Sequence, residues 1–367
     1  MKAVRQSGIE TTPDAKYQLS YFIISYKKEQ TFMREFKMVE GYESGLSLRE
    51  TQKAIKFVKD TFQHEIKPAL NLERISAPLF VSKASGINDD LNGVERKVHF
   101  TIRETGTEAE VVQSLAKWKR MALWRYGFSE GEGLYTDMSA IRRDDDMDNI
   151  HSIYVDQWDW ERVITKDDRN LEFLKSIVRK IVHAISETAK KTQAQYPQLK
   201  NHISEDIFFI TTEELLGLYP DLTPHEREHE IVKKHKTVFL MQIGEKLSNG
   251  KKHDGRAPDY DDWALNGDLF FWNPVLEDAL EISSMGIRVD AESLHRQLTE
   301  ENCLEREKFP YHKGILTGEL PLTIGGGIGQ SRLCLFILEK MHIGEVQSSI
   351  WPDDVVEACR SHHINLL

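Results

Sequence analysis

The feature that most constrains this chain is a glycine-rich stretch, TIGGGIGQSRLCLFIL, at residues 323–338. Four glycines lie within five residues, and Ser331, Arg332 and an apolar run follow them. Glycine lacks a Cβ, so the backbone can turn sharply and lie close against a flat ligand. A helix beginning near Ser331 would direct unpaired N–H groups into that space, and Arg332 could stack on a base or bind phosphate. A tight turn with a surface arginine would explain the same residues. Other parts of the sequence are therefore needed to distinguish a ligand site from such a turn.

Helical and extended patterns alternate irregularly along the chain, and several strands form hairpin-like pairs. Residues 48–67 predict an amphipathic helix that begins with a capping box at Ser47 and Glu50. Pro78 interrupts a strand over 72–80, which suits an edge or an interface. Further helices are expected over 114–125, 167–191, 290–304 and just before Pro220, and further strands over 98–102, 110–113, 134–142, 151–161, 206–211, 237–243, 265–273 and 281–290. This order favours an α+β fold, with an antiparallel β-sheet flanked by helices, over a doubly wound parallel sheet.

Length and charge narrow the classes of function. The 367 residues are 40% hydrophobic, which is enough for a sizeable core. The net charge of −11 argues against a protein that neutralises many nucleic-acid phosphates. No apolar run approaches the roughly 20 residues that a membrane span needs, and no secretory signal is apparent. The three cysteines show no paired spacing, so a reducing, cytoplasmic compartment is expected. We expect residues 1–46 to be an extension, partly disordered or loosely packed, and 47–367 to be a single catalytic domain.

Three familiar motifs do not fit on closer reading. Residues 225–229 read HEREH, a match to the zinc motif H-E-x-x-H, and His235 lies where a third ligand could follow. Val232 stands where that longer motif needs a glycine, so a zinc hydrolase is only a minor alternative. Residues 244–252 resemble a phosphate loop, but the glycine spacing is one residue too long and no Ser or Thr follows the lysine. Gln330 breaks the dinucleotide fingerprint. Any nucleotide would therefore be held in another way.

Polar side chains cluster at the ends of the predicted strands. Charges on a strand face shared with apolar neighbours are costly unless they are paired or bind a ligand. Each of them alone is explained by a structural ion pair, but together they suit a site for both anions and cations. Asp268 and Glu281, on neighbouring strands, could hold Mg²⁺ by oxygen ligands, and arginines would neutralise phosphates. The set fits nucleotidyl transfer by in-line displacement. It comprises Asp89, Lys119, Arg142, Gln157, Asp159, Arg256, Asp261, Asp268, Glu281, Ser284, Arg288 and Arg332.

Three stretches together resemble the three motifs of class II aminoacyl-tRNA synthetases. Residues 72–80 are similar to the first motif, which builds a dimer interface. Arg142, the acidic loop after it and residues 151–161 resemble the second motif. Residues 325–332, GGGIGQSR, resemble the third, whose arginine stacks on adenine and meets a bent triphosphate.

The closer resemblance is to the ammonia-dependent asparagine synthetases, which are aspartate–ammonia ligases of this fold. It runs from about residue 47 to the C-terminus. The matching stretches are SLAKWKR (114–120), GEGLYT (131–136), YVDQWDWERV (154–163), RAPDYDDW (256–263), LNGD (265–268), WNPVLEDA (272–279), SSMGIRVDA (283–291) and TIGGGIGQSRL (323–333). Two features depart from the compact bacterial form of the family. The extension before residue 47 has no counterpart there, and the chain is several residues shorter between Trp263 and Leu265, which would alter a loop near the site.

The resemblance implies a two-step reaction. The β-carboxylate of aspartate attacks the α-phosphorus of Mg·ATP, which gives β-aspartyl-AMP and pyrophosphate, and ammonia then displaces AMP to give asparagine. The resemblance also implies roles for the nucleotide-binding residues. Arg142 would hold the α-phosphate and Arg332 the adenine and γ-phosphate, with Ser152 and Ser284 near the nucleotide. Asp268 and Glu281 would hold Mg²⁺, and Asp268 would also belong to the nucleotide-binding residues.

The same resemblance implies roles on the amino-acid side. Lys119 and Arg288 would bind the carboxylates of aspartate. The amino group and the incoming ammonium would be received by Asp89, Gln157, Asp159 and Asp261. One carboxylate must accept a proton from ammonium before attack, and the division among these four is left open. The expected catalytic residues are Arg142, Arg332, Asp261 and Lys119.

The sequence also bears on alternative functions and on the expected partners. A glutamine-using enzyme would need a glutaminase cysteine, and none lies in a suitable motif, so free ammonia is the expected donor. A tRNA synthetase would need an anticodon-binding domain, for which the 46 residues before the catalytic region leave little room. A catalytically silent relative would have lost its key residues, and Arg142, Asp268, Glu281 and Arg332 are intact. We expect a homodimer with small-molecule substrates and with no nucleic acid or membrane partner.

Overall fold

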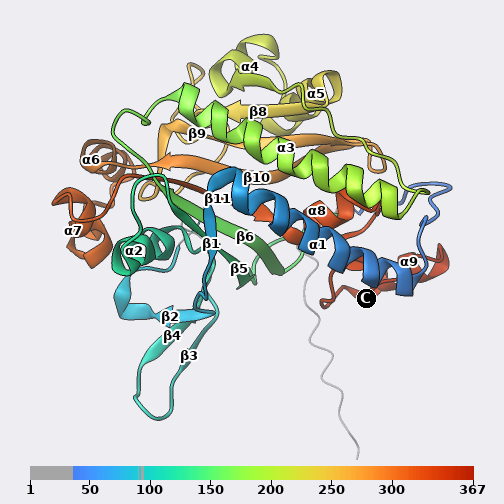
Figure 1. Ribbon diagram of the computed structural model, residues 1–367, viewed down its shortest axis with the longest axis horizontal. Helices are drawn as coiled ribbons and strands as arrows, with labels where there is room; N and C mark the ends of the chain where they lie inside the picture. The colour runs from blue at the N-terminus through green and yellow to red at the C-terminus, as the bar shows by residue number, and fades with distance from the viewer. Residues whose placement is uncertain (1–35, 90, 92–94) are drawn as a thin grey trace, which may run out of the picture. The chain divides into compact units, whose positions relative to one another are not determined.

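The computed structural model describes residues 36–89, 91 and 95–367, and its centre is an eight-stranded sheet (Figure 1). The strand order is β1-β5-β6-β11-β10-β9-β8-β7. The edge strands β1 and β7 pair in parallel with β5 and β8, and the other neighbours pair antiparallel. The predicted α+β class with a largely antiparallel sheet is confirmed. The strands are β1 (Leu72–Arg74), β5 (Gly133–Ile141), β6 (Tyr154–Val163), β7 (Phe208–Thr211), β8 (Thr237–Met241), β9 (Asp261–Asn273), β10 (Asp278–Arg288) and β11 (Thr323–Gly329).

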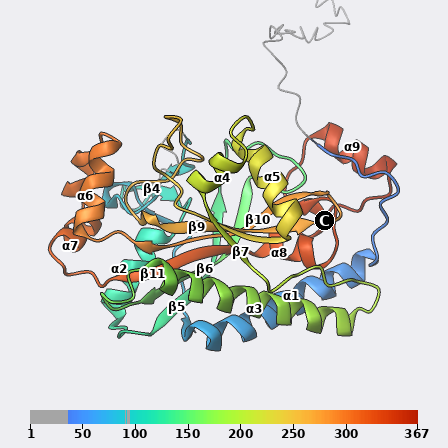
Figure 2. The same cartoon turned by 90° about the horizontal axis from the view of Figure 1, so that it is seen from above.

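Two long helices, α1 (Leu48–Leu70) and α3 (Leu171–Gln195), lie along one face of the sheet (Figure 2). The predicted capping box of α1 is present, because Ser47 and Glu50 each accept the other's backbone N–H. Val58, Phe62 and Ile66 are buried at the predicted helical spacing. The apolar stripe of α1 therefore packs into the core.

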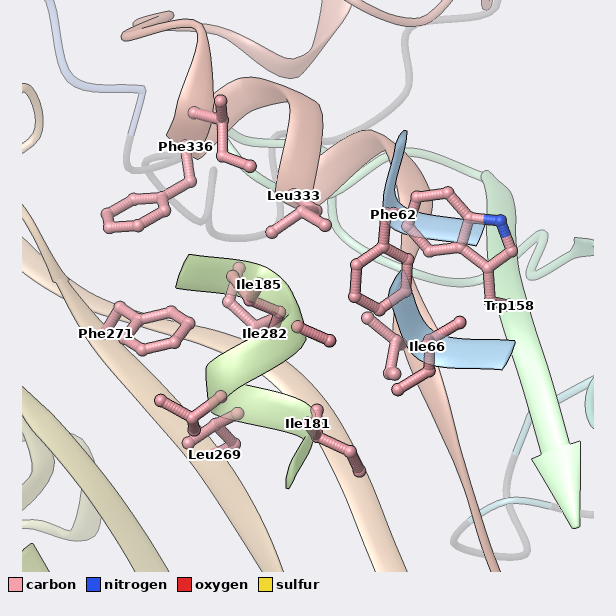
Figure 3. Close-up of a cluster of buried hydrophobic side chains, with 14 of the residues drawn as sticks. Phe62, Ile66, Trp158, Ile181, Ile185, Leu269, Phe271, Ile282, Leu333 and Phe336 are labelled. Carbon is pink, nitrogen blue, oxygen red and sulfur yellow. The ribbon is translucent and has the colours of Figure 1, made fainter. Parts of the chain in front are cut away.

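The core between the helices and the sheet is shown in Figure 3. Phe62 packs on Trp158 of β6 with 4.5 Å between ring centroids. Phe336 of α8 (Gln330–Ile337) stacks on Phe271 of β9 at 5.3 Å. Because successive strand side chains point to opposite faces, Gln157 and Asp159 of β6 lie on the face away from these helices. That second, polar face is available for a ligand site.

The predicted strand over 72–80 is wrong as a single element. Leu72–Arg74 forms β1 in the large sheet, whereas β2 (Phe80–Ser82) belongs to a separate three-stranded sheet with β4 (Glu108–Val111) and β3 (His99–Thr101). Pro78 lies between the two strands, where its missing N–H costs no ladder hydrogen bond. The strand predicted over 98–102 is present as β3, but its predicted half-burial is wrong, because all three residues of β3 are exposed.

The predicted neighbours β9 and β10 pair antiparallel as expected. No loop interrupts the chain between Trp263 and Leu265, where the family's bacterial form was expected to be longer, because β9 runs through these residues without a break. Residues 36–46 belong to the same compact unit as the sheet, and the rest of the predicted extension lies outside the described residues. No helix in the described part of the chain is long and apolar enough to cross a membrane. The other helices are α2 (Ala116–Tyr126), α4 (Thr212–Leu218), α5 (Pro224–His235), α6 (Ala291–Glu300), α7 (Pro310–Leu316) and α9 (Asp353–Ser361).

Candidate active site

Two adjoining cavities open on the polar face of the sheet. The larger has a volume of about 340 Å³ and the smaller about 80 Å³. Residues from β6, β10 and β11 contribute to both walls, so these three central strands form the common floor. The residues that line both cavities are Leu91, Arg142, Gln157, Tyr260, Ser284 and Gly327.

Three arginines and five carboxylates line the larger cavity, and the carboxylates belong to Glu95, Asp145, Asp156, Asp254 and Glu281. Arg142 follows β5, Arg256 precedes β9, and Arg332 comes from the first turn of α8. Arg332 Nη1 donates to the carbonyl of Glu281 at 3.1 Å and lies 3.5 Å from the Glu281 carboxylate. The Arg142 Nε is buried without a hydrogen-bond partner among the described residues. Clustered guanidinium groups of this kind suit an anionic, phosphate-bearing ligand.

The helix after the glycines begins at Gln330, close to the predicted Ser331. The expectation of an unpaired N–H there is wrong for Ser331, because its backbone N–H donates to Asp156 at 3.0 Å. Asp156 also accepts from Gln347 at 3.4 Å, and both residues line the larger cavity. The start of α8 is therefore fixed to β6 by a side chain.

The two predicted metal ligands lie on adjacent strands but differ in exposure. Glu281 lines the larger cavity with 38% of its side chain exposed, whereas Asp268 is buried and lines neither cavity. Asp268 forms an ion pair with Arg256, and its Oδ1 has no partner among the described residues. Burial raises the pKa of Asp268 to about 7, and the nearby charge of Glu281 acts in the same direction. A divalent cation would relieve this repulsion, so the carboxylate pair fits Mg²⁺.

The two predicted serines both line the larger cavity. Ser152 precedes β6, and its hydroxyl donates to Ser349 at 3.0 Å. Ser284 is directly opposite Asp268 in the β10–β9 register. The structure therefore brings together Arg142, Ser152, Glu281, Ser284 and Arg332 around one cavity, with Asp268 beside Ser284 on the neighbouring strand.

The smaller cavity is lined by a network of opposite charges. Lys119 forms an ion pair with Asp159 and donates to the carbonyl of Gly326 at 3.1 Å. Arg288 forms an ion pair with Asp261. Lys119 and Arg288 are 1% and 2% exposed, which is unusual for cations and requires such pairing. Together with Gln157, these are five of the six residues that the sequence assigned to aspartate and ammonium, and Asp89 is the sixth.

A glutamate that was not predicted joins the two buried cations. Glu161 of β6 is fully buried and accepts from Arg288 Nη2 at 2.7 Å and from Thr323 at 2.7 Å. Lys119 Nζ lies 3.8 Å away from it. Burial opposes ionisation, but the charges of Arg288 and Lys119 hold the pKa of Glu161 below its usual value. The two-residue spacing after Gln157 and Asp159 was the signal that could have revealed it.

Asp89 does not line either cavity. It is 1% exposed, and its Oδ1 accepts the backbone N–H of Leu91 at 3.1 Å. Burial raises its pKa. A second group that was not predicted includes Asp259, which is fully buried between Lys117 at 2.8 Å and His312 at 3.0 Å. Asp259 was hidden among the many charges of the loop 253–263.

The glycine stretch forms a strand and not a turn, so the expected sharp turn is wrong. None of Gly325, Gly326, Gly327 and Gly329 has a positive φ. A Cβ on Gly325 would collide with the carboxylate of Glu161, and one on Gly327 with the side chain of Gln157. The glycines are needed because β11 lies between β6 and β10 and has to leave room for their polar side chains.

Among the described residues, the HEREH histidines belong to no group of three ligands close enough to share a metal ion. His229 Nδ1 lies 2.8 Å and His225 Nε2 3.7 Å from Asp278, and His235 stacks on Phe208 at 3.7 Å. Among the residues that the structure describes, the group close enough to share an ion is a different one, consisting of His183, Glu187 and Glu205. Lys190 already pairs with both of its carboxylates.

Comparison with known proteins identifies the fold. Asparaginyl-tRNA synthetase from Pyrococcus horikoshii, solved with asparaginyl-adenylate, superposes with a TM-score of 0.60 at 14% identity, over 83% of this chain and 70% of that one. Aspartyl-tRNA synthetase from Entamoeba histolytica gives 0.52 at 17% identity, over 81% and 58%. The predicted class II synthetase-like fold is therefore confirmed.

Comparison of sequences identifies the family. The chain is 58% identical over 329 residues to the aspartate–ammonia ligase of Ruminiclostridium cellulolyticum, which covers 89% of this chain and 98% of that protein. It is 56% identical over 330 residues to that of Lactobacillus acidophilus, with the same coverage. The family model described as aspartate–ammonia ligase matches residues 49–363. The chain therefore belongs to the aspartate–ammonia ligase family, whose members join aspartate to ammonia.

Proposed function

We propose that this ligase activates aspartate as an adenylate. The β-carboxylate oxygen of aspartate attacks the α-phosphorus of ATP, and the bond to pyrophosphate breaks. Ammonia then attacks the acyl carbon of β-aspartyl-AMP, and AMP leaves as asparagine forms. The observation that carries the proposal is a cavity walled by three arginines that adjoins a smaller cavity lined by both carboxylates and cations. A triphosphate and a dicarboxylic amino acid need this combination of charges.

The larger cavity would take the nucleotide. Arg142 would contact the α-phosphate where charge develops during attack, and Arg332 the adenine and γ-phosphate. Ser152 and Ser284 would contact the nucleotide, and Asp268 and Glu281 would hold Mg²⁺. The bound ion would neutralise phosphate charge. The asparaginyl-adenylate in the Pyrococcus synthetase supports this assignment, because it is an adenylate of similar composition on the same fold.

The smaller cavity would take aspartate. Lys119 and Arg288 would bind its carboxylates, since both cations line that cavity. The amino group and the ammonium would be received by Gln157, Asp159, Asp261 and Asp89, of which Asp89 alone does not line the cavity. Deprotonation of ammonium requires a carboxylate within hydrogen-bond reach. Burial raises the pKa of both Asp89 and Asp261, and only Asp261 of these two lines the smaller cavity, so Asp261 is the carboxylate best suited to accept that proton.

The products distinguish this mechanism from its alternatives. The purified protein would be incubated with ATP, Mg²⁺, ammonium and aspartate labelled with ¹⁸O in its β-carboxylate. We expect AMP, pyrophosphate and asparagine in equal amounts, with one ¹⁸O atom transferred to the AMP phosphate. Formation of ADP, or unlabelled AMP, would contradict the adenylate. Glutamine in place of ammonium is expected to give no asparagine.

We further propose a cytoplasmic homodimer. The strand β1 lies at an edge of the large sheet, next to the end of α1, and an unpaired edge is suited to contact a second copy. Sedimentation of the purified protein would test the dimer, and a monomer at micromolar concentration would contradict it.

A further inference from the structure

The segment 36–44, which we call the strap, contacts two parts of the chain that wall the larger cavity. It precedes α1, which begins at Leu48. Figures 1 and 2 draw it in blue beside α9. Phe36, Met38, Val39 and Tyr42 pack against a buried cluster that includes Val355 and Cys359 of α9. The strap is thus anchored to the C-terminal part of the domain.

The first polar contact of the strap is made through Asn149. The Asn149 side chain accepts the backbone N–H of Lys37 at 2.7 Å and donates to the carbonyl of Lys37 at 2.9 Å. The side chain also donates to the carbonyl of Met341 at 3.0 Å. The backbone carbonyl of Asn149 accepts the N–H of Ile343 at 2.8 Å. Asn149 is 5% exposed, so these bonds are shielded from water. Asn149 therefore joins the strap, the loop before β6 that contains it, and the turn after α8, by which we mean residues 338–347.

The second polar contact is made through Tyr42. Its hydroxyl lies 3.1 Å from both carboxylate oxygens of Glu345, which is 2% exposed. Glu345 accepts the backbone N–H groups of Met341 and His342 at 3.0 and 3.2 Å. Lys340 lies 3.7 Å from Glu345 and donates to Ser44 at 2.6 Å. The strap thus fixes the same turn at a second point.

Both tied segments reach the larger cavity. Ile150, His151 and Ser152 follow Asn149 directly and line the cavity, and Ile343 and Gln347 of the turn line it as well. Gln347 donates to Ser331 at 3.1 Å, one residue before Arg332. A displacement of either segment would therefore move the cavity wall on the nucleotide side. The smaller cavity has no residue from these segments in its lining.

We propose that the strap is a positioning element for the nucleotide site, acting through Asn149 and Glu345. This inference rests on the proposed function, because it takes the larger cavity to be the ATP site. It predicts that loosening the strap weakens nucleotide binding and leaves aspartate binding nearly unchanged. A purely structural role would instead lower stability and affect both substrates alike.

The test uses two variants of the full chain. Asn149→Asp replaces the donor that faces the carbonyls of Lys37 and Met341, and Tyr42→Phe removes only the hydroxyl. The matched controls are Asn201→Asp, whose side-chain oxygen still accepts the N–H of Ile203, and Tyr196→Phe, which packs on Phe57. AMP and ATP binding would be measured by calorimetry, and KM for ATP and for aspartate by steady-state kinetics.

We expect Asn149→Asp to weaken nucleotide binding and to raise KM for ATP about tenfold. The reason is that buried hydrogen bonds from the side-chain amide become repulsive contacts between oxygen atoms. Tyr42→Phe should give a smaller change in the same direction. KM for aspartate should stay within about twofold, as should every constant of the controls. Unchanged nucleotide binding in both variants, or an equal rise in both KM values, would overturn the strap proposal. A wild-type protein that binds neither AMP nor ATP would instead overturn the assignment of the nucleotide site, and the strap's role with it.

Discussion

Replacing Glu161 with glutamine tests how far the smaller cavity depends on a residue behind it. Glu161 is fully buried, and its carboxylate accepts three contacts from Arg288, at 3.0, 3.0 and 2.7 Å, and one from Thr323 at 2.7 Å. Glu161→Gln keeps the size and one acceptor oxygen but places an N–H₂ donor against donors of Arg288. Breaking one side of a buried ion pair costs about 3–5 kcal/mol. Because Arg288 keeps Asp261 and Lys119 keeps Asp159, we expect about 3 kcal/mol.

This loss can be measured as both stability and function. With about 2 cal/mol/K of unfolding entropy per residue, a domain of residues 35–367 should lose about 4 °C in Tm. Arg288 would lose the contacts that fix its guanidinium group at the smaller cavity, so KM for aspartate should rise at least tenfold while KM for ATP changes little. Urea denaturation and steady-state kinetics would measure both effects.

The matched control for this change is Glu172→Gln. The Glu172 side chain is 78% exposed and contacts Lys175 at the surface of α3, so stability and both KM values should stay nearly unchanged. A Glu161→Gln protein with a stability within about 1 kcal/mol of wild type and an unaltered KM for aspartate would refute the reasoning.

Three further predictions concern the larger cavity and the turn beside it. Arg332→Ala should raise KM for ATP and lower kcat at an unchanged Tm, and unchanged kinetics would reject its assigned role. Glu281→Gln should raise the Mg²⁺ concentration needed for half-maximal activity, so an activity that resists EDTA would contradict the metal site. Burial lowers the pKa of His342 from 6.5 to about 4, which keeps its Nδ1 as an acceptor for Gly344 at 3.0 Å. Its contribution to stability is therefore complete above pH 6.5 and declines by up to about 3 kcal/mol between pH 6.5 and about 4, below which it changes no further. His342→Asn should flatten this part of the stability profile in urea titrations, and an identical profile would show that His342 is not responsible.

Local pattern was enough to predict the elements whose shape depends on neighbouring residues. The capping box at Ser47 and the apolar spacing of α1 are confirmed, as is the antiparallel pair β9 and β10. The alternation along β6 also places Trp158 in the core and Asp159 at the smaller cavity. The long matching stretches predicted the family, which the comparisons confirm.

The errors arose where a residue's role depends on a distant partner. Pro78 was placed inside one strand, although its flanking strands join different sheets. The glycines after Thr323 were expected to turn, because the neighbours β6 and β10 that crowd them are separate in the sequence.

The sequence by itself therefore determined the long helices, the strand pairs β5–β6 and β9–β10 and the family, because short-range periodicity and matching stretches encode them. Only the tertiary structure decided that Glu161 pairs with Arg288, 127 residues away, and that the strap meets the turn at Glu345. Sheet order and register set these contacts, and both depend on how the whole chain buries its apolar surface.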